Sequence, residues 1–187
     1  MAVLHEATLR PSKLEILAEW VPQQPWYPGD AADFEVLGRF RFDDPAGDVG
    51  IETYLLGRPD GTLFHVPLTY RGAPVPGLDA ALISTLEHSV LGDRWVYDAT
   101  ADPVYLAVVE DVIRTGGAQA DQVVHKADGT TAEVPTSVRA YGRPADGAGD
   151  RLDIVRAPDR SPAPTDAPVL LASWPGQDEP IVLARLG

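Results

Sequence analysis

The sequence predicts an α+β fold, in which an antiparallel sheet with about three helices is followed by a β-rich C-terminal segment. Apolar and polar residues alternate along several short segments, as in strands with one buried face. Capping residues precede other segments in which apolar residues recur at helical spacing. The chain has 187 residues, 44% of them hydrophobic, and is therefore long enough to bury a sizeable core.

Two helices are predicted from their capping residues. In residues 12–20, Ser12 and Glu15 have the spacing of a capping box, and an apolar stripe follows them. Asp102 and Pro103 are typical of the N-cap and the first helical position. The helix that they open is expected to end at the two glycines that follow Thr115.

A further helix is predicted for residues 79–90 from apolar spacing alone. Leu82, Leu86 and Val90 recur at intervals of four, which places them on one helical face. Gly92 follows the segment, as expected for a C-terminal cap.

The N-terminal part also predicts an antiparallel meander. Phe40 and Phe42 should face one side of the first strand, with Arg39 and Arg41 on the other. Pro67 indicates an edge strand or a bulge, because proline cannot donate to the ladder. The expected strands are residues 34–42, 49–56, 62–70 and 94–97.

After residue 117 the chain changes character. Asp128 and Gly129 form a hairpin signal between the first two strands expected there. We therefore predict a domain at residues 1–117 and a β-rich segment or small domain at residues 118–187, which could instead extend the first sheet. Its expected strands are residues 122–126, 131–141, 151–156, 169–174 and 181–186.

Composition excludes several classes of function. The formal net charge is −13, and the two lysines, Lys13 and Lys126, lie far apart, so no basic footprint for a nucleic acid is present. The same charge would be repelled by an anionic membrane surface. There is no cysteine, no apolar run long enough to span a bilayer and no signal-peptide pattern at the start of the sequence. We expect a cytoplasmic protein.

One motif carries a family resemblance. Trp20, Gln24, Trp26, Tyr27 and Gly29 resemble a segment near the start of maltokinases, whose N-terminal cap domain has a tryptophan and then a Gln-Arg-Trp-Phe/Tyr-x-Gly stretch after its first helix. Two further blocks resemble the same caps, at residues 65–71 and 97–103. The likeness covers roughly residues 5–117 and is similar to that of free-standing bacterial cap-like proteins.

The resemblance implies an antiparallel sheet wrapped by helices in a cystatin-like topology. It also implies a kinase body after the cap, but the sequence shows neither a His-x-Asp catalytic segment nor a glycine-rich phosphate loop. Pro25 replaces the arginine of the family motif, and Asp30 stands where a basic residue is common. We therefore expect no kinase activity of the chain on its own, and a structural role for the Trp-Tyr-Gly corner.

Searches for catalytic and metal-binding patterns yield little. Ser84 and His88 could touch on a helix, but no nucleophile elbow is present. The acid pairs Asp43/Asp44 and Asp178/Glu179 fall in expected turns, where carboxylates are usually solvated. No histidine pair has the spacing of a helical zinc site among His5, His65, His88 and His125. We assign no catalytic residue, metal ligand or cofactor.

Aromatic and arginine side chains are the best candidates for ligand binding. Flat aromatic faces suit sugar rings, and arginines at strand ends could donate hydrogen bonds to them. The alternative is that the aromatic residues fill the core and that the arginines form ion pairs with Glu52 or Asp98. The candidate residues are Trp26, Tyr27, Arg71, Arg94 and Trp95.

The resemblance points to maltose, trehalose or α-glucan metabolism. The leading hypothesis is a non-catalytic binding or regulatory module that docks on a sugar kinase or an α-glucan enzyme. A docking module should expose an apolar patch and lack a deep polar pocket. The second hypothesis is a binding protein for a sugar or sugar phosphate, which predicts a concave polar site with an exposed tryptophan. The third is an undescribed glycan-active enzyme.

Overall fold

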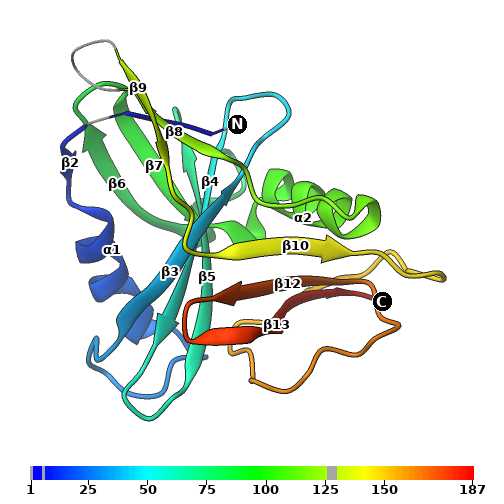
Figure 1. Ribbon diagram of the computed structural model, residues 1–187. Helices are drawn as coiled ribbons and strands as arrows, with labels where there is room; N and C mark the ends of the chain where they lie inside the picture. The colour runs from blue at the N-terminus through cyan, green and yellow to red at the C-terminus, as the bar shows by residue number, and fades with distance from the viewer. Residues whose placement is uncertain (1, 6, 126–129) are drawn as a thin grey trace.

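The computed structural model of the protein describes residues 2–5, 7–125 and 130–187. Its largest element is a six-stranded sheet in the order β2-β6-β7-β5-β4-β3, in which every neighbouring pair is antiparallel (Figure 1). The α+β class is confirmed. The strands are β2 (Leu9–Arg10), β3 (Glu35–Phe42), β4 (Gly50–Gly57), β5 (Leu63–Arg71), β6 (Leu82–His88) and β7 (Gly92–Asp98).

The central strands β4 and β5 are buried on both faces. Phe64 and Tyr54 belong to a hydrophobic cluster on the face that α1 covers, whereas Leu63 and Leu55 belong to a cluster on the opposite face. Pro67 was expected at an edge or a bulge, and this was wrong because β5 is central. The missing N–H is tolerated there because pairing with β7 begins only at the next residue.

Two helices form as their capping residues predict. In α1 (Lys13–Trp20), Ser12 and Glu15 form the complete capping box. In α2 (Pro103–Thr115), the Asp102 side chain accepts a hydrogen bond from the Val104 N–H, and Gly116 ends the helix with a φ of 71°. A short 3-10 helix, η1 (Val21–Gln23), extends α1, and another, η3 (Ala99–Ala101), precedes α2.

The helix predicted for residues 79–90 is absent. The short 3-10 helix η2 (Asp79–Ala81) leads directly into β6, so that the described residues contain two α-helices and not about three. Leu82 and Leu86 are four residues apart, a spacing that shares one face in a strand as well as in a helix. Pairing with β7 decided between the two, and Gly92, with a φ of 73°, follows the turn between β6 and β7.

The C-terminal part is β-rich, as predicted. β1 (Ala2–His5) pairs in parallel with β8 (Gln122–His125), which pairs with β9 (Thr131–Val134). A four-stranded sheet has the order β10-β12-β13-β11, with β10 (Arg139–Arg143), β11 (Leu152–Ile154), β12 (Val169–Trp174) and β13 (Gln177–Leu186). The single strand predicted at residues 131–141 is divided in two after Val134. Lys126 and the turn at Asp128 and Gly129 lie outside the described residues.

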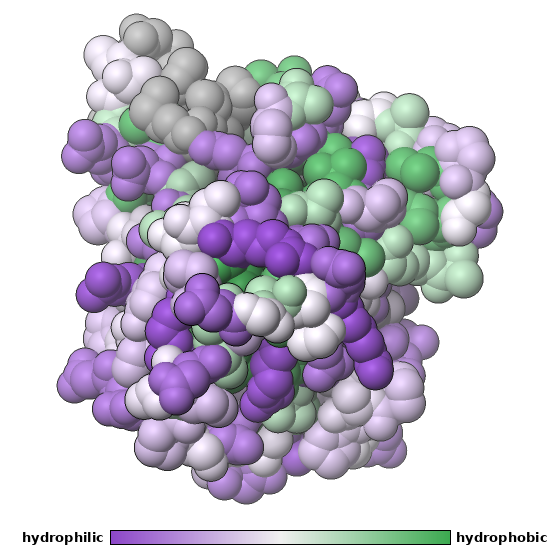
Figure 2. Space-filling view, turned by 90° about the vertical axis from the view of Figure 1, so that its right-hand side faces the viewer, coloured by the Kyte–Doolittle hydropathy of each residue, from purple (hydrophilic) through white to green (hydrophobic). Residues whose placement is uncertain are grey.

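One hydrophobic cluster joins the two parts of the chain. Phe40 and Ile51 from the first sheet share it with Val109 of α2 and with Leu170 and Leu183 of the second sheet. Figure 1 shows α2 running alongside β10, and Figure 2 shows hydrophobic side chains gathered at the height of α2 on that side of the molecule. The two-domain division near residue 118 stays a prediction, but the core crosses that point.

Two close contacts reinforce this packing. A Cβ at Gly142 in β10 would lie 1.8 Å from the carbonyl oxygen of Val112, so that only glycine allows α2 to approach this strand. In β5, the His65 N–H donates to the Arg156 carbonyl oxygen, and Nδ1 of its ring donates to the Val155 carbonyl oxygen at 3.2 Å. No helix among the described residues is both long and apolar enough to cross a membrane.

Candidate functional site

A hollow of about 770 Å³ opens on the α1 side of the large sheet. Its wall comes from the start of α1, the loop between β3 and β4, and the turn between β6 and β7. This volume lies in the range of small-molecule sites. Polar and apolar side chains both line it, including Lys13, Arg41, Tyr70, Leu86, Arg94, Leu91 and three aspartates of the β3–β4 loop.

Two arginines reach the hollow from strands that are not neighbours. Arg41 lies on β3 and Arg94 on β7. A Cβ at Gly50 would lie 3.2 Å from Arg41 Nη2, a tight contact, whereas one at Gly72 would make an ordinary contact of 3.4 Å with Arg94 Nη1. Glycine at position 50 therefore leaves room for the Arg41 guanidinium.

A buried ion pair lies beside the hollow. Lys13, at the start of α1, contacts Glu52 of β4, whose side chain is 1% exposed. Arg39 Nη1 lies 3.6 Å from the second oxygen of Glu52. Burial alone would raise the pKa of Glu52, but the charges of Lys13 and Arg41 outweigh it, so the pKa lies below its ordinary value. Glu52 is therefore a carboxylate at neutral pH.

Burial in this ion pair destabilises the charged form of Lys13. Burial lowers the pKa of the Lys13 ammonium, and the attraction of Glu52 offsets this effect only in part. The ammonium also lies 4.8 Å from the centre of the Tyr70 ring. Among the described residues, neither the hydroxyl of Tyr70 nor Nε of Arg41 has a hydrogen-bond partner, although both atoms are buried. This corner of the sheet is thus dense in desolvated polar groups.

The aspartates at the rim are partly occupied. The Asp44 carboxylate accepts hydrogen bonds from the N–H groups of Ala46, Asp48 and Val49 at 2.9–3.0 Å, which orders the β3–β4 loop. Asp43 has an interaction of its own. The acid pair Asp43/Asp44 noted in the sequence therefore lies at the hollow, but Asp44 has a structural role there.

Trp26 and Tyr27 lie together, away from the hollow. The Tyr27 ring centre is 4.9 Å from that of Phe64, and the Tyr27 hydroxyl donates to Asp33 and to the Ala31 carbonyl oxygen. Trp26 is partly buried, and the guanidinium carbon of Arg156 lies 5.2 Å from the centre of its ring. Both aromatic residues pack in the cluster under α1.

Arg71 and Trp95 are opposite each other on β5 and β7. Arg71 binds Asp102 through two hydrogen bonds, of 2.5 and 3.0 Å, so its ion pair is structural, although with neither Glu52 nor Asp98. Burial would raise the pKa of Asp102, but hydrogen bonds from Arg71 and Thr69 keep it below its ordinary value. Asp98 is instead paired with Arg156.

The five candidate residues thus fall into three places. Phe64, which packs against Tyr27, is seven residues from Arg71 along β5, a distance of roughly 23 Å in an extended strand. Of the five, Arg94 alone lines the hollow. The sequence interpretation missed Lys13 and Arg41, although the alternation of Arg39 and Arg41 with Phe40 and Phe42 did indicate a polar face.

Ser84 and His88 lie on β6, so the helical contact considered for them does not form. Nδ1 of His88 accepts hydrogen bonds from the N–H groups of Val90 and Leu91. In the part of the chain that the structure describes, no group of three or more His, Asp or Glu side chains is arranged to hold a metal ion.

The comparisons with known proteins agree with the motif around Trp26. Residues 20–102 match the maltokinase N-terminal cap domain. Over this segment, which is somewhat less than half of the chain, the protein is similar to that cap domain. A search of curated proteins found no match to the chain.

The matched cap domain contains strands β3–β7 and ends at Asp102, the N-cap of α2. Arg41 and Arg94 therefore lie within the cap domain, whereas Lys13 lies before the matched segment. Trp26 and Tyr27 of the Trp-Tyr-Gly corner pack in the hydrophobic cluster under α1 and do not line the hollow. The cystatin-like topology implied by the resemblance stays a prediction.

Proposed function

We propose that this cap-domain protein is a non-catalytic binding or regulatory module of maltose or α-glucan metabolism that acts in the cytoplasm on a protein partner. The partner is a sugar kinase or an α-glucan enzyme, in keeping with the maltokinase cap. The observation that carries the proposal is an apolar hairpin at the free edge of the large sheet, formed by β6, β7 and the turn between them.

This hairpin is suited to protein contact. It carries three of the five large hydrophobic residues that are exposed among the described residues, with Leu82 40%, Val90 55% and Leu91 43% exposed. In the part of the chain that the structure describes, the outer edge of β6 pairs with β2 at Glu87 and His88 alone. Within that part, residues 82–86 have no strand paired to their outer edge, and a strand of a partner protein could pair there.

The test is a pull-down from cytosol with tagged wild type and a Leu82→Asp/Val90→Asp variant, read by quantitative mass spectrometry. Stoichiometric recovery of a sugar kinase or α-glucan enzyme with wild type, and its loss with the variant, is expected. Leu14→Asp is the matched control, because Leu14 is 58% exposed but lies on α1. Recovery of the bait alone, or equal recovery with the double variant, would contradict docking through this hairpin.

The hollow favours a second candidate function, which is binding of a sugar or sugar phosphate. Its lining of basic, acidic and apolar side chains matches the mixture of polar groups and carbon faces on a sugar. The four tryptophans are at least partly buried, so the exposed tryptophan expected for such a site is absent. Thermal melting with neutral and phosphorylated sugars tests this candidate. No shift at millimolar concentrations of either class would contradict it.

A further inference from the structure

We propose that Arg41 and Arg94 bind the phosphate group of a phosphorylated sugar in the hollow. The proposal rests on the second candidate function, since it names the chemical group that the same hollow recognises. The observation that carries it is that both guanidinium groups line the hollow while neither forms an ion pair with a carboxylate of a described residue.

Four cationic side chains gather at this corner, opposite Glu52 and the three aspartates of the β3–β4 loop. Glu52 is one carboxylate, yet Lys13 contacts it directly, Arg39 lies within ion-pair distance, and Arg41 is close enough to stabilise its charge. Arg94 adds a further cation, whose Nη1 donates to the Asp93 carbonyl oxygen. A phosphate monoester carries a charge of about −1.5 to −2 near neutral pH. It could pair with the guanidinium groups of Arg41 and Arg94, which the aspartates of the β3–β4 loop do not bind in an ion pair that the structure shows.

Arg41 also lacks a complete set of hydrogen-bond partners. Its Nε is buried and has no partner among the described residues. Burying a guanidinium nitrogen without a hydrogen-bond partner is unfavourable. In a binding site, a ligand oxygen that accepts a hydrogen bond from this nitrogen would remove the penalty. Other arginines of the protein, such as Arg58 and Arg71, instead bind carboxylates with two nitrogens each.

The floor fits a ligand larger than a phosphate ion. Gly50 is paired with Tyr70, and Gly72 follows two residues later along the chain after β5, so the two glycines are diagonal neighbours roughly 7–8 Å apart. Each glycine lies under one guanidinium group. The two guanidinium groups can therefore donate to one phosphate from two sides, and the sugar extends into the rest of the hollow. The volume of about 770 Å³ leaves room for one or two sugar rings.

The rim contributes selectivity. Its three aspartates repel any anion, and the hydroxyl groups of a sugar can offset this repulsion by donating hydrogen bonds to carboxylate oxygens. A sugar phosphate has both kinds of group, whereas inorganic phosphate has no carbon-bound hydroxyls. The net charge of −13 further disfavours nonspecific binding of anions.

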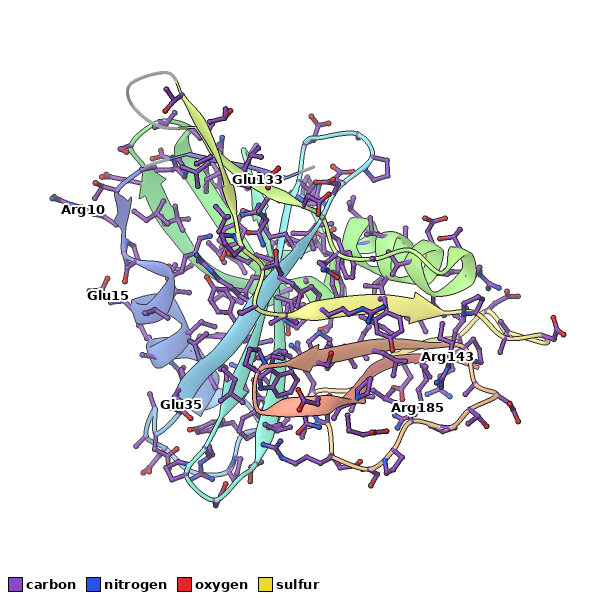
Figure 3. All side chains as sticks on the ribbon, viewed as in Figure 1. Arg10, Glu15, Glu35, Glu133, Arg143 and Arg185 are labelled. Atoms are coloured by element: carbon purple, nitrogen blue, oxygen red, sulfur yellow. The ribbon has the colours of Figure 1, made fainter. Side chains whose placement is uncertain are left out.

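The test is isothermal titration at constant ionic strength with glucose, glucose 6-phosphate, glucose 1-phosphate and inorganic phosphate. We expect at least one sugar phosphate to bind about tenfold or more tightly than glucose and than inorganic phosphate. Arg41→Met and Arg94→Met should each weaken that binding by about tenfold or more, the usual effect of losing a charged hydrogen bond. Arg10→Met is the control, because Arg10 is exposed and Figure 3 shows it pointing outward from β2.

A second variant protects the test against misfolding. Gly50→Ala would place a methyl group 3.2 Å from Arg41 Nη2, so the guanidinium must shift while its charge is kept. This variant should also weaken binding of the sugar phosphate. Equal affinity for glucose and its phosphates would overturn the proposal but leave sugar binding intact. Undiminished binding by both arginine variants would overturn it as well, and the absence of any sugar binding would overturn both ideas.

Discussion

His65 is expected to make the protein less stable as the pH falls below about 6.5, the ordinary pKa of histidine. The ring is fully buried, donates from Nδ1 to the Val155 carbonyl oxygen and has Nε2 3.5 Å from the Tyr105 hydroxyl. Burial, with a smaller contribution from the Arg156 charge, lowers the pKa of His65 to about 3, against 6.5 for an ordinary histidine. The folded protein therefore keeps this ring neutral where the unfolded chain protonates it.

The sign follows from proton binding. Between pH 6.5 and about 3 the unfolded chain binds a proton that the folded protein does not, so the free energy of unfolding falls as the pH falls. Each pH unit in this window corresponds to 1.36 kcal/mol. Lowering the pH from 6.5 to 4.5 should therefore cost roughly 2.3 kcal/mol through His65 alone, because the unfolded histidine is already half protonated at pH 6.5. This contribution becomes constant above about pH 7.5.

Urea unfolding at pH 7.5, 6.5, 5.5 and 4.5 measures the effect. His65→Gln keeps a polar side chain but does not titrate, so the decrease in this range should largely disappear. His88→Gln is the control and should retain it, because His88 lies on β6 and is only partly buried. In the wild type, the ring resonances of His65 should not titrate between pH 8 and 4.5 in NMR spectra.

A pH dependence in His65→Gln equal to that of the wild type would refute the reasoning. So would a His65 resonance that titrates near pH 6.5, because it would show that the ring is accessible to protons in the folded protein. The NMR measurement decides the matter even if the variant does not fold.

Three further substitutions probe the buried contacts. Glu52→Gln should lower the unfolding free energy by about 3–5 kcal/mol because Lys13 loses its counter-charge. Adding Lys13→Met should recover most of this loss. A double variant no more stable than Glu52→Gln would contradict the reasoning. Asp102→Ala should lower the free energy of unfolding in urea by about 2–4 kcal/mol, because α2 loses its N-cap and Arg71 loses both of its hydrogen bonds to Asp102. A loss under about 1 kcal/mol would argue against the ion pair. Gly142→Ala should lower the free energy of unfolding by about 3 kcal/mol or more. Gly117→Ala is the control, because its Cβ would be 3.5 Å from its nearest neighbours, and the loss in the same assay should stay within about 1 kcal/mol. Similar losses for the two variants would refute the close approach of α2.

Local signals in the sequence were sufficient for the helices with caps. Ser12 and Asp102 each satisfy N–H groups within the next few residues, so the sequence contains the whole interaction. Residues 79–90 lacked such a signal. Their apolar spacing fits a strand equally well, and the pairing of β6 with β7 was not visible in it.

The candidate site was less predictable because it depends on contacts between distant segments. Arg71 and Asp102 are separated by 31 positions and meet because β5 ends beside the start of α2. The side to which Arg41 points could be predicted from its alternation with phenylalanines. Arg41 and Arg94 line one hollow because of the way the strands curve and pair. A single sequence does not determine that arrangement in a way that can be read from its pattern.

The hydrophobic cluster that crosses residue 118 has a consequence for the evolution and engineering of this chain. A domain whose hydrophobic core includes residues of β12 and β13 cannot be transferred to another protein as an independently folding unit. Cutting the chain after residue 117 would leave Phe40, Ile51 and Val109 facing water. The two fragments should instead complement each other when they are produced together, since each supplies the missing wall of the other. Recombination at this point would therefore be tolerated only where both halves are inherited as a pair.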